Sequence, residues 1–407
     1  MNMIRSISFF VLASIALTAP CAALHIGQRF ILTLPATQDR TQLSSWLEKT
    51  KPAGVMLVAG HFANRAKTKE LITFLQHEAQ RLGIPPLFVT VDWEGGIVSR
   101  PTEAGGFYSI PSPWALARAS RDTCYRAGML VGHQMASIGA NINFAPSLDL
   151  FDPNNQILAT RCFSDDESVV AEVGIAFAKG LMSQGALPVI KHFPGLGLGK
   201  QDTHTTSVGI DVDTQLFERH EHPFKEALSA GLPCIMPTHA SFKQFGSLPT
   251  TRSPQAVKHL RTHNPNALLI TDDFAMAAGQ HNSTTEQAVW QSLSAGYDLI
   301  IFSGILGGGG GATAAQVNAI NALQHKLATL PQKQHQIFEA RDKHIRTCKQ
   351  KYLGCKPTAP TDFDEADLSR FLAQRCFPSG DNIPRITTSN VVLLSVKLPA
   401  IRPPESW

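Results

Sequence analysis

Three residues stand out for the chemistry they could perform: Asp202 and His204 in a polar loop, and Asp272 at the end of an apolar run. In an extended loop, side chains at positions i and i+2 point to the same side, so the Asp202 carboxylate can fix the His204 tautomer and stabilise its cation. Such a pair can transfer protons beside a carboxylate nucleophile. Taken alone, however, Asp-Thr-His is also a common turn and Asp272 a common helix N-cap.

Further ionisable residues occur where apolar runs end. A charge at the tip of a buried strand is costly unless it is paired or used. Side chains at the ends of parallel strands would gather at one edge of a sheet, so we expect a functional site there. The residues concerned are Asp92, Asp149, Lys191, His192, His239, Asp272 and Asp273.

The elements that must position these residues alternate in type along the chain. Short runs rich in Val, Ile and Leu recur between longer helical patterns, and this alternation is typical of βα units around a parallel sheet. Eight such runs predict an α/β fold, a single (β/α)8 barrel with active groups at its C-terminal face. The runs span 30–34, 54–60, 87–92, 142–150, 188–193, 234–239, 268–273 and 298–303.

Helix boundaries have their own signals. A Ser followed three residues later by Glu is the spacing of a capping box, and glycine is favoured just after a helix. The spacing predicts capping boxes at Ser164 with Glu167 and at Ser283 with Glu286, and helix ends near Gly231 and Gly296.

Five fragments, in this order along the chain, resemble glycoside hydrolase family 3 and, within it, the bacterial β-N-acetylglucosaminidases. The resemblance spans roughly residues 27–303, and each fragment alone is short. The fragments are VDWEGGIVSR from Val91, NFAPSLDL from Asn143, RCFSDD from Arg161, KHFPGLGLGKQDTHTT from Lys191 and ITDDFAM from Ile270.

This resemblance implies a role for each matching residue. Asp272 would be the nucleophile of a retaining glycosidase, and His204 the acid/base catalyst supported by Asp202. The implied substrate is a small carbohydrate containing N-acetylglucosamine, such as a peptidoglycan fragment or a chitooligosaccharide, cleaved without cofactor or metal. The implied substrate-binding residues are Asp92, Arg100, Arg161, Lys191 and His192.

Several positions leave alternatives open. Arg100 and Arg161 could be structural ion-pair partners, and His239 could be a wall residue rather than a substrate contact. Trp93, where the family has Gln, could stack on a sugar or be buried. The His, Asp and Thr of the family's FPGHGDT motif are replaced here, which leaves open the conformation of this loop and the substrate preference. An Arg that the family has in the loop after the third strand is also replaced. These replacements are Leu196, Leu198, Gly199 and Ile97.

The chain divides into three predicted segments. Residues 1–23 combine Arg5 with an apolar stretch and small residues, which indicates a secretory signal peptide and a periplasmic or secreted protein. Lipid anchoring at Cys21 is the alternative, although Pro20 fits such processing poorly. Residues 24–352 would form the barrel, with a flexible glycine loop at 307–311, and 353–407 a linker and C-terminal appendage containing a short amphipathic helix.

Composition restricts the remaining possibilities. The chain has 407 residues, 43% of them hydrophobic, and a formal net charge of +4, the balance of a folded protein. No clustered basic run suggests a nucleic-acid partner, and no stable membrane span is expected after signal removal. We expect Cys162 and Cys234 to be buried thiols, with a staple among Cys348, Cys355 and Cys376. No CxxC or His-rich spacing suggests zinc.

Two other functions remain open at this point. One is a family 3 β-glucosidase, which is disfavoured because those enzymes usually take their acid catalyst from a second domain. The other is a sugar- or muropeptide-binding barrel without catalytic activity, which the altered loop at residues 196–199 suggests.

Overall fold

The computed structural model describes residues 25–155, 157–199, 201–303, 311–354, 357–358 and 361–377. The predicted signal peptide, Cys355 and most of the glycine loop lie outside these residues. Within them, no helix is long and apolar enough to cross a bilayer.

Eight parallel strands close into a barrel in the order β1-β12-β11-β9-β7-β6-β3-β2. This confirms the predicted (β/α)8 architecture, and each strand falls inside or within one residue of a predicted run. The barrel strands are β1 (Phe30–Thr33), β2 (Gly54–Met56), β3 (Phe88–Val91), β6 (Ile142–Asn143), β7 (Leu187–Phe193), β9 (Cys234–Pro237), β11 (Leu268–Asp273) and β12 (Leu299–Phe302). Two small pairs lie outside the barrel: β4 (Trp93–Gly95) with β5 (Val98–Ser99), and β8 (Gly209–Ile210) with β10 (Ser241–Phe242).

The strand β6 is much shorter than the run 142–150 that predicted it. After Asn143 the regular register with β7 is lost, although Val189 N still donates to Ala145 O and Lys191 N to Pro146 O, both at 3.1 Å, and Ser147 forms an isolated bridge with Lys191. Pro146 lies between these points and has no N–H to contribute to a ladder, which explains the interruption. The apolar character of the run therefore reports burial rather than continuous strand.

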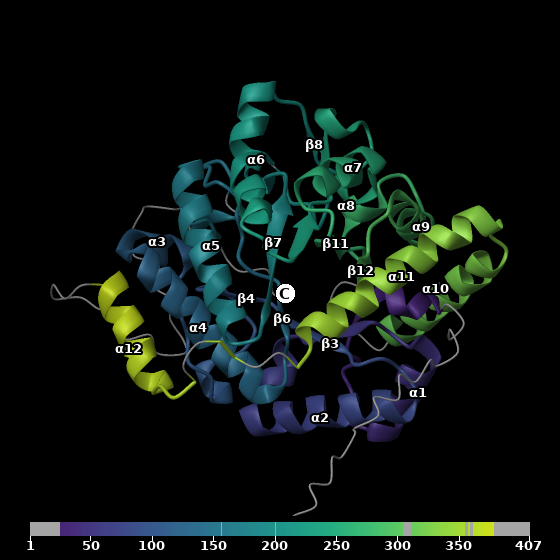
Figure 1. Cartoon of the computed structure of the whole chain (residues 1–407), viewed down its shortest axis with the longest axis horizontal. Coiled ribbons are helices and arrows are strands. Elements are labelled where there is room, and N and C mark those ends of the chain that lie inside the picture. Colours follow the sequence, from purple (N-terminus) through teal and green to yellow (C-terminus); the bar gives the residue numbers. More distant parts are fainter. Residues whose placement is uncertain are drawn as a thin grey trace, which may run out of the picture.

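Helices surround the barrel and connect its strands (Figure 1). They are α1 (Arg40–Thr50), α2 (Arg65–Arg81), α3 (Pro113–Ala119), α4 (Arg121–Ile138), α5 (Glu167–Ser183), α6 (Thr214–Ser229), α7 (Pro254–His263), α8 (Ala277–Gln280), α9 (Thr285–Ala295), α10 (Gly311–Ala328), α11 (Gln332–Tyr352) and α12 (Glu365–Cys376). The last of these, α12, packs against α3 and α4 at the side of the barrel (Figure 1).

Neither predicted capping box forms at the residues expected, because both helices begin at a different residue. Asp166 caps α5, and its carboxylate accepts hydrogen bonds from Ser168 N and Val169 N. The box at α9 is formed by Thr284 with Gln287. In each case a neighbouring residue that also caps well stands nearer the helix start, and spacing alone cannot rank the two.

The predicted helix ends are confirmed. Gly231 follows α6 and Gly296 follows α9, both at positive φ. In the left-handed region a side chain would be strained, so glycine is favoured at these two positions.

The core has two layers separated by the barrel wall. Along β1, Phe30 and Leu32 face the surrounding helices, while Ile31 faces the barrel interior. This alternation follows from the two-residue repeat of a strand. The interior cluster also includes Ile345 and Cys348 of α11, which packs against the strand starts and leaves the other end of the barrel for a site.

The described cysteines are thiols rather than disulfides. Cys162 and Cys234 are buried, as expected, and burial raises the pKa of each thiol well above its usual value. A link between Cys348 and Cys376 is not formed, because Cys348 is packed into the interior cluster while Cys376 lies on α12. The division of the chain at residue 352 remains a prediction.

Candidate active site

Four of the site residues predicted from the sequence come from strand ends on one side of the barrel. Asp92 follows β3, Lys191 and His192 lie in the last part of β7, and Asp272 lies at the end of β11. Because parallel strands of a closed barrel end at the same face, these side chains share the C-terminal mouth.

Glu94 is the centre of a buried charge cluster. Its two carboxylate oxygens accept hydrogen bonds from Arg161 Nε and Nη2, each at 2.8 Å, and Lys191 Nζ lies 2.6 Å from Oε1. The Glu94 side chain is fully buried. Burial alone would raise the pKa of Glu94, but Arg161 and Lys191 outweigh it and hold this pKa far below its usual value.

Asp92 extends this cluster toward solvent. Its carboxylate lies 3.1 Å from Lys191 Nζ and 3.7 Å from Arg100 Nε. Asp92 and Arg100 stay partly exposed, whereas Lys191 is buried. The structural ion pairs considered for both arginines are thus present, and the exposed pair can still reach a bound molecule.

His192 is oriented by a buried carboxylate, that of Asp149, which lies 2.6 Å from His192 Nδ1. Asp149 also accepts hydrogen bonds from Ser147 Oγ at 2.8 Å and Leu196 N at 2.6 Å. Burial alone would raise the pKa of Asp149, but His192 and these hydrogen bonds lower it. An ionised Asp149 accepts a hydrogen bond from Nδ1–H, which keeps the proton on Nδ1 and so fixes the imidazole tautomer.

The two adjacent carboxylates at the end of β11 lie in different environments. Asp273 accepts hydrogen bonds from Ala275 N and Ser303 N, both at 3.0 Å, so it connects β11 to the end of β12. Burial raises the pKa of Asp273 in spite of these bonds. The Asp272 carboxylate accepts a hydrogen bond from the next residue, where Asp273 N donates to Oδ1 at 2.9 Å.

Three imidazoles favour the ionised form of Asp272. Burial alone would raise the pKa of this carboxyl, but His239, His192 and His204 lower it below its usual value. An ionised carboxylate at the barrel mouth is the form that can attack an electrophilic carbon.

The loop that carries the predicted acid/base pair lies over this region. His204 Nδ1 lies 2.6 Å from Asp202 Oδ1, and the same oxygen accepts a hydrogen bond from His204 N at 2.9 Å. The loop is joined to the segment after β11, because Ala277 N donates to His204 O at 3.1 Å and Ala278 N to Thr203 O at 3.2 Å. The pair is partly exposed, so a substrate can reach it.

The sequence departures at the start of this loop are accommodated by two braces. Asn155 Nδ2 donates to Leu196 O at 3.0 Å and to Gly199 O at 2.9 Å. Asp149 accepts from Leu196 N, and Leu196 itself is buried. Residues 196–199 are therefore braced without the polar side chains that the family's motif would supply.

His239 is a wall residue. Its Nδ1 lies 2.7 Å from Thr251 Oγ1 and its Nε2 lies 3.0 Å from Asp273 O. Both ring nitrogens are thus engaged within the protein, and burial lowers the pKa of His239. The imidazole supports the segment at Asp273 rather than offering a nitrogen to a ligand.

Trp93 does not contact the mouth. Its side chain is fully buried and packs edge-on against Phe107, with ring centroids 5.7 Å apart. Sugar stacking on Trp93 is therefore excluded. Ile97, the other change in this loop, is exposed.

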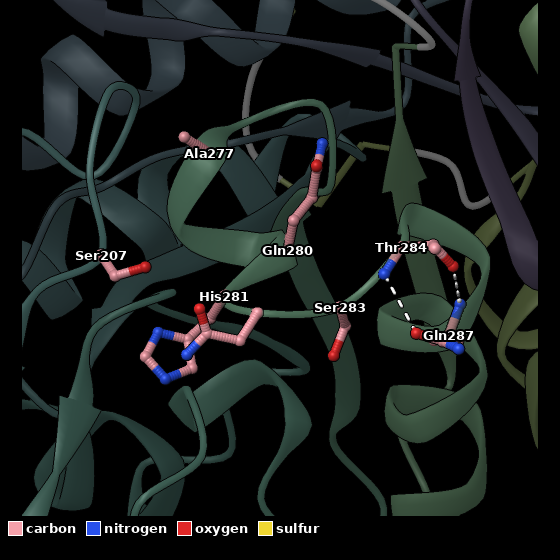
Figure 2. A pocket seen from close by; sticks show the side chains of 8 residues that line it. Ser207, Ala277, Gln280, His281, Ser283, Thr284 and Gln287 are labelled. Atoms are coloured by element: carbon pink, nitrogen blue, oxygen red, sulfur yellow. Dashed lines mark hydrogen bonds between the residues drawn. The ribbon is translucent and has the colours of Figure 1, made fainter.

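An open hollow of about 580 Å³ adjoins the acid/base loop (Figure 2). Figure 2 shows polar side chains around it, mostly from the segment that follows β11. Its lining residues are Ser207, Ala277, Gln280, His281, Asn282, Ser283, Thr284 and Gln287.

Sequence reasoning missed three residues that organise the site. Glu94 lies inside the VDWEGG fragment, and its acidity beside Asp92 was the available signal. Asp149 was recognised as a polar strand end but was given no role. Asn155 carries no signal, because its function depends on a loop distant in sequence.

Comparison with known proteins identifies the family of the chain. The model described as "Glycosyl hydrolase family 3 N terminal domain" matches residues 24–337. A beta-hexosaminidase of Stenotrophomonas maltophilia (strain K279a) is 28% identical over 284 residues, covering 67% of this chain and 82% of that protein. A beta-hexosaminidase of Hydrogenovibrio crunogenus is 30% identical over 263 residues, covering 61% of this chain and 71% of that protein.

A solved structure supports the fold. The family 3 beta-N-acetylglucosaminidase from Paenibacillus sp. str. FPU-7 superposes with a TM-score of 0.74 at 24% identity, covering 86% of this chain and 68% of that one. The chain therefore belongs to glycosyl hydrolase family 3 and is a glycoside hydrolase whose relatives are named beta-hexosaminidases.

Proposed function

We propose that the protein is a retaining exo-β-N-acetylglucosaminidase that removes terminal N-acetylglucosamine from peptidoglycan fragments or chitooligosaccharides. The observation that carries this proposal is the Asp202–His204 pair, joined at 2.6 Å and bonded through its backbone to the segment that follows Asp272. This arrangement supplies a supported imidazole and an ionised carboxylate at one barrel mouth.

The proposed reaction has two steps. In the first, Asp272 attacks the anomeric carbon while His204 donates a proton to the glycosidic oxygen, so the C–O bond breaks and a glycosyl ester forms. In the second, His204 takes a proton from water, whose oxygen attacks the anomeric carbon and releases the Asp272 carboxylate. Asp202 stabilises the imidazolium form of His204 in each cycle.

The charged cluster would hold the sugar. Asp92 can accept hydrogen bonds from hydroxyl groups, and Arg100 and His192 can donate to hydroxyls or to the acetamido carbonyl. Arg161 and Lys191 are also proposed sugar contacts, and their bonds to Glu94 would hold them in position. Sites of this kind combine a shaped cavity with a few fixed polar groups.

The first 23 residues support an exported enzyme that acts in the periplasm or outside the cell. A mass spectrum of the protein isolated from its native compartment tests this point. Cleavage near residue 23 is expected, whereas an intact N-terminus would contradict export. A lipid-modified Cys21 would indicate that the exported protein is anchored to a membrane rather than released.

The activity is tested with chromogenic β-N-acetylglucosaminide and β-glucoside substrates assayed side by side. Preference for the first supports the proposal. Preference for the second indicates a β-glucosidase, and no turnover of either indicates a binding protein.

The acid/base role is tested with His204→Ala and a series of leaving groups. Removing a general acid typically costs about 10²–10⁴-fold, and the loss should be largest for leaving groups that most need a proton. The matched control His77→Ala removes an exposed imidazole on α2. An equal loss for every leaving group would contradict the assignment of His204.

A further inference from the structure

A second cluster of ligating side chains lies on the outer side of the barrel, away from the proposed chemistry. Glu221 belongs to α6, and His259 and His263 belong to α7. Histidines four residues apart share one helix face. We propose that Glu221, His259 and His263 form a zinc site that joins α6 to α7.

The distance between the two histidine nitrogens fits a tetrahedral ion. Nitrogens that lie about 2.0–2.1 Å from a tetrahedral Zn²⁺ are themselves about 3.3–3.4 Å apart. His259 Nε2 and His263 Nε2 are 3.4 Å apart. One ligand atom from each of the three residues lies within 4.8 Å of the others, and the Glu221 carboxylate contacts His259 Nε2. Three protein ligands leave the fourth position for water.

A single proton on His259 Nε2 cannot join all three groups. If His259 Nε2 carries a proton, that single N–H must serve either Glu221 or His263. A proton on His263 Nε2 would then face an N–H rather than a lone pair, because a neutral imidazole nitrogen is either a donor or an acceptor. A divalent cation would accept lone pairs from all three atoms at once.

The charges around the cluster are a buried carboxylate and a nearby ammonium group. The Glu221 side chain is buried and supplies the negative charge that a divalent cation needs. Lys225, which also acts on His263, is the charge that opposes cation binding. Metal ligation uses the unprotonated imidazole rings, so zinc should bind more weakly as pH falls.

The site is connected to β7 through aromatic packing. The His259 ring lies 6.3 Å from the Phe193 ring and 5.5 Å from the Phe245 ring, measured between centroids. Phe193 directly follows His192 in the sequence. Zinc would therefore stabilise the wall behind the mouth, as a structural ion that takes no part in the glycosidase reaction.

The spacing of the two histidines was visible in the sequence as HLRTH at 259–263. Sequence reasoning found no zinc pattern, because it looked for CxxC or His-rich stretches. The third ligand comes from another helix, so only the fold reveals the complete set.

The test uses the full chain stripped with EDTA and titrated with ZnCl₂, followed by calorimetry and metal analysis. We expect the double variant His259→Ala/His263→Ala to bind one Zn²⁺ per chain fewer than the wild type. His222→Ala is the matched control, because it removes a histidine next to Glu221 that is not among the three ligands. Equal stoichiometry in the wild type and the double variant would overturn the proposal, as would the same loss in the control.

Two further measurements guard against a variant that fails to fold. Glu221→Gln keeps the side-chain volume and should weaken zinc binding at least about tenfold, the scale of a change in a metal's ligand environment. X-ray absorption of the zinc-loaded wild type should show imidazole and oxygen ligands. Thiolate ligands in that spectrum, or unchanged affinity in Glu221→Gln, would contradict the site. Neither result depends on glycosidase activity.

Discussion

Substituting Glu94 with Gln probes the buried charge cluster that holds two proposed sugar contacts. The change preserves volume but removes a fully buried negative charge. Glu94 makes three short contacts, two with Arg161 at 2.8 Å and one with Lys191 at 2.6 Å. The Gln amide has one acceptor oxygen, so at least one of these contacts becomes a donor facing a donor.

The expected cost follows from what remains buried. Without Glu94, Lys191 retains Asp92 at 3.1 Å, but Arg161 loses its bidentate partner. Breaking a buried pair by removing one partner typically costs about 3–5 kcal/mol. This is a large fraction of the roughly 5–15 kcal/mol by which folded domains are stable.

Urea denaturation at pH 7, followed by tryptophan fluorescence, measures this cost. Glu103→Gln is the control, because Glu103 is an exposed acid whose substitution should change stability by less than about 0.5 kcal/mol. A loss below about 1 kcal/mol for Glu94→Gln, or an equal loss in the control, would refute the reasoning.

The pH dependence gives a second check on the same residue. The pKa of Glu94 is lowered in the folded protein from an ordinary value of 4.5. A lowered carboxyl pKa contributes stability that is fully present above the unfolded value and is lost as pH falls toward the folded value. The difference between wild type and Glu94→Gln should therefore be constant from pH 6 to 7 and shrink below about 4.5.

Three further predictions concern other parts of the structure. Asp149→Asn should lower kcat/KM on a chromogenic substrate about 5- to 150-fold, because leaving the His192 tautomer unsupported costs about 1–3 kcal/mol; an unchanged kcat/KM would count against this role. Asn155→Ala should speed amide hydrogen exchange across 196–199 about fivefold or more, because two carbonyl partners are lost, and unchanged exchange would contradict the brace. Hydrogen bonding to Asp298 raises the pKa of His344 to about 9. A raised pKa contributes stability that is fully present below pH 6.5 and is lost as pH rises through 9, so His344→Gln should destabilise the protein at pH 6 and have little effect at pH 10. A difference in urea stability between wild type and variant that stays constant with pH would refute this prediction.

The barrel could be predicted from sequence because its strands are largely buried on both faces and read as mostly apolar runs. The runs at 268–273 and 234–239 gave strands within two residues of the observed ends. The run at 142–150 misled because burial and strand pairing are different properties, and Pro146 interrupts only the second.

The partners within the site could not be predicted in the same way. Arg161 and Glu94 are 67 residues apart, and their bidentate contact depends on how two loops meet above the barrel. Asp202 and His204 are neighbours in sequence, so their pairing was accessible from spacing alone. Pairing between neighbouring residues can be predicted from the sequence pattern, whereas contacts between distant segments can be identified only in the folded structure.

The central claim is that Asp272 forms a covalent bond to the sugar. The direct measurement is incubation with a fluorinated N-acetylglucosaminide that slows breakdown of the intermediate, followed by peptide mass spectrometry. We predict one sugar per chain on the peptide containing Asp272, and no labelling in Asp272→Asn. Hydrolysis of an activated N-acetylglucosaminide without any label on Asp272, or a label on another carboxylate, would contradict the account.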